Sequence, residues 1–167
     1  CRQMVHRARE RVRDARRRVA DSVPPPGERE RLVERFVAAL AAEDEAGMLA
    51  LFTDDVIWVS DGGGKAPAVP RVVSGADRVA KLAVGYERMG RDYGVTHEVA
   101  WINGEPAVLT LVAGRTAFTT SFAVDGGRIS AVYRVLNPDK LRRVGPPPFL
   151  GDAAPAAARS APADRAE

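Results

Sequence analysis

The 167-residue sequence has little of the chemistry on which metal centres, disulfide frameworks and membrane spans depend. It contains one cysteine, Cys1, and two histidines, His6 and His97, that lie far apart. A single cysteine excludes an internal disulfide or a cysteine zinc cluster, and two distant histidines argue against a metal site. No apolar run reaches the roughly 18 residues that a transmembrane helix needs. We therefore expect no metal, no other cofactor, no membrane association and a cytoplasmic location.

Arginine, by contrast, is abundant and concentrated at the start of the chain. The first 22 positions carry eight arginines against three acidic residues, whereas the other positions carry 17 basic and 19 acidic residues. The formal net charge of +3 conceals this asymmetry. Because clustered arginines attract phosphate regardless of sequence, the pattern predicts a nucleic-acid-facing element joined to a nearly neutral domain.

Residues 1–22 have the periodicity of one amphipathic helix, with apolar residues every three or four positions among the arginines. Three prolines and a glycine within residues 23–27 then predict a stiff linker and a domain boundary. The simpler interpretation of this segment is a charged, solvated helix that binds no partner. Since the chain opens with Cys1 inside a helical pattern, we expect it to be the C-terminal part of a longer protein.

The following residues alternate between helical and β-type patterns. Residues 28–42 predict a helix with one apolar face, and Asp44 is a suitable N-cap for a second short helix up to Phe52. Residues 56–60 predict a strand, and Ser74 is a plausible N-cap for a third helix that ends near Met89.

After residue 94 the helical period gives way to four β-rich runs, at residues 95–102, 107–113, 116–124 and 128–136. Three short segments separate them, and each contains residues that tolerate a positive φ: Asn103-Gly104, Gly114-Arg115 and Asp125-Gly126-Gly127. Three successive hairpin turns predict an antiparallel meander.

Helices first and strands last indicate the α+β class, in which a curved antiparallel sheet wraps round the long helix and leaves an open-ended pocket. We place this domain at residues 28–145. Residues 146–167 are rich in proline and alanine, and those from 151 onward lack any large apolar residue. Such a segment does not bury enough apolar surface to offset its ordering entropy, so we expect it to be disordered.

Two stretches resemble the paired signatures of bacterial extracytoplasmic-function (ECF) sigma factors that carry a C-terminal SnoaL-like, or NTF2-like, extension. They are Ser60-Asp-Gly-Gly-Gly-Lys65 and Val132-Tyr-Arg-Val-Leu-Asn-Pro-Asp-Lys-Leu141. The opening helix is similar to the end of the recognition helix in sigma region 4. The resemblance covers about residues 1–145, and it implies a SnoaL-like cone with a regulatory rather than catalytic role in transcription initiation.

The resemblance also implies partners and site residues. In a full-length parent these partners are core RNA polymerase, promoter DNA, and sigma regions 2 and 4 of the same chain. The recognition helix would reach base edges through its first residues, Arg2, Gln3, His6 and Arg7. The regulatory interdomain contact would involve two groups of residues: Asp61, Gly62, Gly63, Gly64 and Lys65, and Asn137, Pro138, Asp139, Lys140 and Leu141.

Both groups also have simpler interpretations. The glycine run is not a phosphate-binding loop, because that motif needs a wider glycine spacing and a Ser or Thr after its lysine, whereas Lys65 precedes Ala66 and Pro67. It is otherwise a turn that ends a strand. Asn137–Leu141 is otherwise a turn in which Pro138 ends the ladder.

A pocket in the cone would be lined by polar and aromatic candidates from several elements: Trp58, Tyr86, His97, Trp101 and Tyr133. Asp54 and Asp55 are further candidates for acid–base chemistry. The sequence places no carboxylate partner next to His97, so we expect no catalysis. Trp58, Trp101 and Tyr133 are most simply core aromatics.

Two alternatives remain. One is a small ligand-binding or hydrolytic SnoaL-like protein of the polyketide cyclase or epoxide hydrolase type, which a deep pocket with a buried His97 or a pair of aspartates would favour. A filled or purely apolar cone would favour regulation. The other is a homodimer formed through the open face of the sheet.

Overall fold

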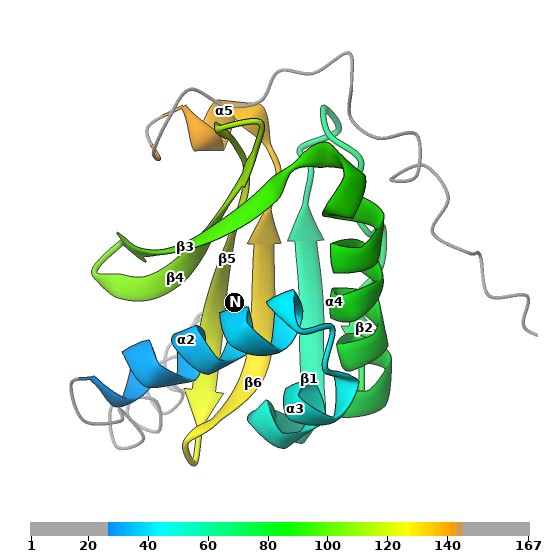
Figure 1. The fold of residues 1–167 in the computed structure, drawn as a ribbon, viewed down its shortest axis with the longest axis vertical. Helices are drawn as coiled ribbons and strands as arrows, with labels where there is room; N and C mark the ends of the chain where they lie inside the picture. The colour runs from blue at the N-terminus through cyan, green and yellow to red at the C-terminus, as the bar shows by residue number, and fades with distance from the viewer. Residues whose placement is uncertain (1–26, 143, 145–167) are drawn as a thin grey trace, which may run out of the picture.

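The computed structural model describes residues 27–142 and 144. Within them the strands form one six-stranded sheet, and helices pack against one face of this curved sheet (Figure 1). The helices are α2 (Glu28–Ala41), α3 (Glu45–Leu51) and α4 (Ala76–Gly90), followed by a short 3₁₀ turn, η1 (Arg91–Tyr93). The expected helix of residues 1–22, with Arg2, Gln3, His6 and Arg7, and the expected disordered tail lie outside the described residues and stay predictions.

The strands are β1 (Phe52–Asp61), β2 (Val73–Ser74), β3 (Val95–Ile102), β4 (Glu105–Val112), β5 (Arg115–Asp125) and β6 (Arg128–Val135). Their order in the sheet is β2-β1-β6-β5-β4-β3. The predicted meander from β3 to β6 is confirmed as antiparallel. The sheet as a whole is mixed, however, because β1 pairs in parallel with β6, the last strand of the meander. A short helix, α5 (Pro138–Leu141), follows β6.

Local sequence signals explain most of the element ends. Asp44 caps α3 as predicted, since its carboxylate accepts a hydrogen bond from the Gly47 N–H at 2.9 Å. The prediction that Ser74 caps α4 is wrong. Ser74 belongs to β2 and pairs with Ile57, and Gly75 with φ of 95° occupies the N-cap position instead. The backbone conformation there belongs to the region that glycine adopts most readily.

The hairpin turns follow the residues that tolerate positive φ. Asn103 and Gly104 have φ of 54° and 82°, as a type I′ turn requires. The second turn lies one residue earlier than predicted, at Ala113 and Gly114 with φ of 49° and 72°. Arg115 begins β5 and pairs with Val112.

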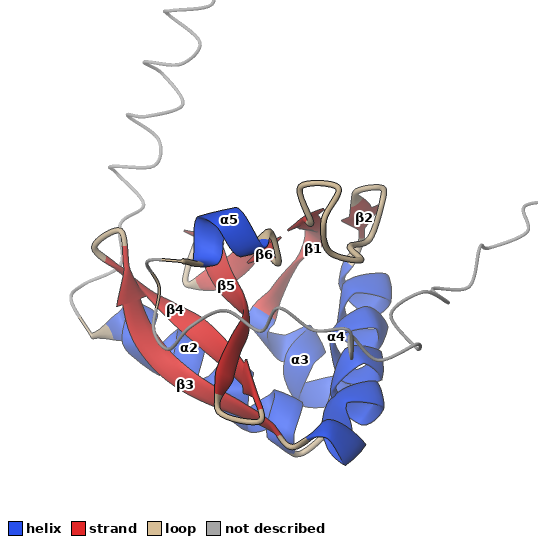
Figure 2. Ribbon diagram, turned by 90° about the horizontal axis from the view of Figure 1, so that it is seen from above, coloured by secondary structure: helices blue, strands red, loops and turns tan. Residues whose placement is uncertain are grey.

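The core lies between the helices and the sheet. Leu32, Phe36 and Leu40 of α2 are buried at the predicted three- and four-residue spacing. Phe36 meets Phe122 of β5 edge to face, with ring centroids 4.8 Å apart. Such burial contributes about 1.5–3 kcal/mol for each large apolar side chain. Figure 2 shows that α2, α3 and α4 together occupy the inside of the curved sheet.

Two of the three aromatics expected in the core are exposed. Trp58 is buried, whereas Trp101 is 65% exposed and Tyr133 is 43% exposed. Tyr133 follows the buried Val132 along β6, so it faces the opposite side of the sheet. Trp101 lies on β3, an edge strand of the described sheet, which has a neighbour on one side only. None of the described helices is long and apolar enough to cross a membrane.

Candidate functional site

The two signature segments meet at one end of the sheet. Asp61 ends β1, Val135 ends β6, and the parallel register places these two residues side by side. The Asp61 carbonyl then accepts hydrogen bonds from the N–H groups of Leu136 and Asn137, at 2.8 and 3.0 Å. Figure 1 shows the loop after β1 and α5 at this same end of the sheet. We call residues Asp61–Lys65 and Asn137–Leu141 the paired-motif cluster.

Two reciprocal ion pairs join the halves of the paired-motif cluster. Lys140 donates to the Asp61 carboxylate at 2.6 Å, and Lys65 donates to the carboxylate of Asp139. Each half therefore supplies one lysine and one aspartate. The two lysine side chains are 58% and 62% exposed, so both pairs are accessible from outside the domain.

Close backbone packing supports these pairs. Asp61 accepts from the Gly63 N–H at 2.9 Å, and the Asn137 side chain caps α5 by accepting from the Asp139 N–H at 3.0 Å. Gly63 has φ of 58°, and a Cβ there would overlap the Asn137 side chain. The absence of a side chain at Gly63 thus permits the two motifs to approach each other closely. Leu141 is buried beneath the cluster.

The charge pattern predicts how the cluster responds to pH. The hydrogen bond from Lys140, and then that from the Gly63 N–H, hold the pKa of Asp61 below its ordinary value. The hydrogen bond from Lys65 likewise lowers the pKa of Asp139. A carboxyl group with a lowered folded-state pKa stabilises the fold above its unfolded pKa of about 3.9, and this contribution is lost as the pH falls further.

We therefore expect Asp61→Asn combined with Asp139→Asn to be less stable than the native sequence at pH 6. The difference should vanish as the pH falls through the lowered pKa values, below about 4. Denaturant unfolding of both proteins between pH 3 and pH 6 measures this. Asn retains the turn hydrogen bonds, so the comparison isolates the charges. A difference that persists unchanged at pH 3 would contradict the assignment.

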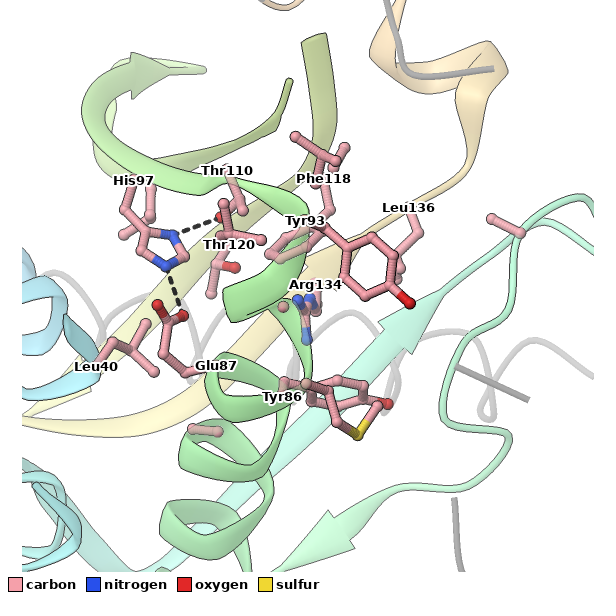
Figure 3. Close-up of a pocket in the computed structure, with 18 of the residues that line it drawn as sticks. Leu40, Tyr86, Glu87, Tyr93, His97, Thr110, Phe118, Thr120, Arg134 and Leu136 are labelled. Atoms are coloured by element: carbon pink, nitrogen blue, oxygen red, sulfur yellow. Dashed lines mark hydrogen bonds and ion pairs between the residues drawn. The ribbon is translucent and has the colours of Figure 1, made fainter. Parts of the chain in front are cut away.

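A cavity of about 450 Å³ opens between the sheet and α4, beside the paired-motif cluster (Figure 3). Lys65 and Pro138 contribute to its wall as well as to the cluster. Of the residues expected to line a pocket, the structure places Trp58, Tyr86 and His97 in the wall, while the exposed Trp101 and Tyr133 do not line it. Asp54 and Asp55 are exposed on β1, and neither lines the cavity.

His97 has a carboxylate partner that its sequence neighbourhood did not reveal. Its Nε2 lies 2.7 Å from Glu87 Oε2, and its Nδ1 lies 3.0 Å from the Thr110 hydroxyl (Figure 3). Glu87 is on α4, directly after the cavity residue Tyr86. The sequence placed no carboxylate beside His97, and it is helix packing that brings Glu87 to it across ten residues of sequence.

Arg134 is the cavity residue that sequence reasoning missed. It is 7% exposed, and its guanidinium carbon lies 3.4 Å from the Phe118 ring centroid, 4.5 Å from that of Tyr86 and 5.6 Å from that of Trp58. Burial lowers its pKa to about 10, while the charges of Tyr86 and Glu87 act in the opposite direction. Strand alternation was a usable signal, since Arg134 is two residues after the buried Val132 and faces the same side.

No group of three or more His, Cys, Asp or Glu residues that could hold a metal ion occurs within residues 27–142 and 144.

Comparison with known proteins identifies the class. Residues 33–144 match the SnoaL-like domain family. Because this match covers more than half of the chain, the chain belongs to the SnoaL-like family. It is similar to the ECF RNA polymerase sigma factor SigJ of Mycobacterium tuberculosis (strain ATCC 25618 / H37Rv), with 33% identity over 149 residues. That match covers 84% of this chain and 47% of the relative.

A second curated relative is the probable ECF RNA polymerase sigma factor SigI of Mycobacterium tuberculosis (strain CDC 1551 / Oshkosh). It is 30% identical over 145 residues, which cover 84% of this chain and 45% of the relative. The crystal structure of SigJ matches with a TM-score of 0.61 and 29% identity, over 84% of this chain and 49% of that one. The chain is thus related to ECF sigma factors, and it spans about half the length of the curated relatives it matches.

A de novo designed protein with a curved β-sheet matches with a TM-score of 0.52 and 16% identity, over 70% of this chain and 90% of that chain. This likeness concerns the fold alone. The homology to SigJ and the SnoaL-like domain together confirm the family resemblance, and they also confirm the expected α+β cone.

Proposed function

We propose that this chain is the regulatory C-terminal portion of an ECF sigma factor. In this proposal the SnoaL-like domain modulates promoter and RNA polymerase binding through contacts with sigma regions 2 and 4. The observation that carries the proposal is the pair of reciprocal ion pairs in the paired-motif cluster. The names of the two curated relatives, both sigma factors, support it.

The ion pairs suit recognition better than they suit stabilisation. Both lysines are more than half exposed, and exposed pairs of this kind contribute only about 0–1 kcal/mol to stability. The loop that positions them contains two residues with positive φ, Gly63 and Gly64. Glycine adopts such a backbone readily, so the loop can form a tight turn that presents its charges to another domain even though its ion pairs add little stability.

The paired arrangement also provides a way to switch. An arginine of a neighbouring domain can take the place of one of the two lysines, and a carboxylate of that domain can take the place of one of the two aspartates. The number of ion pairs then stays the same. The free and docked states then differ by little energy, as contacts between domains of one chain commonly do. The predicted recognition helix of residues 1–22 would contact DNA through Arg2, Gln3, His6 and Arg7 in the same parent protein.

Transcription from a cognate promoter by a full-length sigma factor containing this chain tests the proposal. We expect Lys65→Ala or Asp139→Ala to change promoter-dependent transcription about fivefold or more, since interdomain couplings are typically worth 1–3 kcal/mol. Lys81→Ala is the matched control. It removes an equally exposed ion pair, with Asp77 on α4, at a distance from the cluster.

Exchanging the charges of Lys65 and Asp139 distinguishes a contact with another domain from an ion pair that only holds the two loops together. The double variant Lys65→Asp with Asp139→Lys preserves an internal ion pair but reverses the charges presented to a neighbour. If the pair only holds the two loops together, this variant transcribes like the native protein. Unchanged transcription in the exchange and in both alanine variants would refute the proposed contact.

The cavity favours a second candidate, a small-molecule-binding SnoaL-like protein. The buried His97 beside Glu87 is the feature that we expected such a protein to have. For His97 to act as a general base on a bound water or ligand, one of its two contacts would have to open, because Glu87 and Thr110 occupy both of its ring nitrogens. The polar groups of the cavity therefore fit binding better than they fit hydrolysis.

A further inference from the structure

Arg134 stands out because it is a buried cation that makes no ion pair among the described residues; the Glu87 carboxylate acts on it only from beyond ion-pair distance. Within the described residues, no carboxylate lies at ion-pair distance from its guanidinium, and its Nε has no hydrogen-bond partner. Its side chain enters the cavity from β6 (Figure 3). Buried charges in proteins are otherwise paired or hydrogen-bonded, so this one requires an explanation.

Cation–π contacts explain only part of it. Three aromatic rings surround the guanidinium, those of Trp58, Tyr86 and Phe118. Ring faces stabilise a cation, but they accept no directed N–H hydrogen bonds and carry no neutralising charge. The rings therefore hold the guanidinium in a defined orientation without satisfying the Nε–H donor. This is the arrangement of a preformed receptor for an anion.

The rest of the cavity wall indicates which chemical groups the ligand carries besides its anionic group. The volume of about 450 Å³ lies in the range of small-molecule sites. The wall is largely apolar, with contributions from Leu40, Val108 and Phe118 among others. His97 and Glu87 already satisfy each other, so they make no comparable demand for a charged ligand.

We propose that the cavity binds a small organic carboxylate, whose carboxylate group pairs with Arg134 and whose apolar body lies against the aromatic and aliphatic wall. The planar guanidinium matches a carboxylate in a two-point, parallel hydrogen-bonded geometry. A monoanionic head group suits one cation in an apolar surrounding better than a dianionic phosphate does. The inference goes beyond the proposed transcriptional role, because binding is measurable on this chain alone.

Tryptophan fluorescence provides the test. The chain has two tryptophans, Trp58 beside Arg134 and the exposed Trp101 outside the cavity wall. Trp101→Phe therefore leaves Trp58 as the sole reporter. The probes are hexanoate, cyclohexylacetate and phenylacetate, each compared with its own neutral amide. We expect at least one carboxylate to change the Trp58 emission in a saturable way and to bind about tenfold or more tightly than its amide.

Arg134→Met should abolish the preference for carboxylate over amide, and Arg134→Lys, which keeps the charge without the fork, should reduce it. Arg78→Met is the matched control, since Arg78 is exposed on α4 and should leave the preference intact. Equal binding of carboxylates and amides would overturn the proposal, as would binding by none of them. So would an unchanged preference in folded Arg134→Met. The comparison of acid with amide needs no substitution at Arg134, so it stands even where Arg134→Met or Arg134→Lys prevents folding.

Discussion

Gly63→Ala should destabilise the domain by about 2–4 kcal/mol, because two costs add at this position. The left-handed backbone, with φ of 58°, costs a residue with a Cβ about 1–2 kcal/mol. The new Cβ would also overlap the Asn137 side chain, which the hydrogen bond from the Asp139 N–H holds in place. The two loops of the paired-motif cluster would have to separate. Denaturant unfolding of the two proteins measures the difference.

Gly64→Ala is the control for backbone strain alone. Gly64 has φ of 70°, but a Cβ there would meet no described atom within 4 Å. We expect a loss of only about 1 kcal/mol. Equal losses at the two glycines would show that strain alone is responsible and that the loops do not depend on close contact. In a full-length sigma factor, Gly63→Ala should also reproduce the transcriptional effect of Lys65→Ala if our proposed function is correct.

Arg134→Met should stabilise the empty domain by about 1–2 kcal/mol, which is unusual for a buried position. Burial lowers the pKa of Arg134 to about 10, and this shift corresponds to a penalty of about 3 kcal/mol for keeping the cation buried. Cation–π contacts with the three aromatic rings offset about 1–2 kcal/mol of this burial penalty. Methionine fills similar space, carries no charge and makes favourable contacts with aromatic rings.

Thermal and denaturant unfolding without added ligand measure this change in the free energy of unfolding. The exposed substitution Arg78→Met should leave stability within about 0.5 kcal/mol. A clear loss of stability in Arg134→Met would mean that the aromatic rings make the arginine a structural element. A gain would mean that the domain retains Arg134 at a cost in stability, as expected of a binding residue.

The sequence by itself determined the order and class of the elements, because each depends on neighbouring residues. The apolar spacing of α2 reflects the helical period, Asp44 caps α3 within three residues, and glycines end the strands of the meander. The family signatures were also readable, since they are contiguous. Ser74 and the second hairpin turn show the limit of such prediction. At each place two adjacent residues suit the cap or the turn almost equally well, and tertiary packing decides which of them takes the position.

Only the tertiary structure decided which distant residues meet. The parallel pairing of β1 with β6 brings Asp61 to Lys140 and Lys65 to Asp139, across more than seventy residues. The packing of α4 against the sheet brings Glu87 to His97. The cage around Arg134 needs rings from three separate elements. No local sequence pattern encodes such contacts, because they depend on how the whole sheet curves round its helices. That curvature also decides which charged side chains become buried.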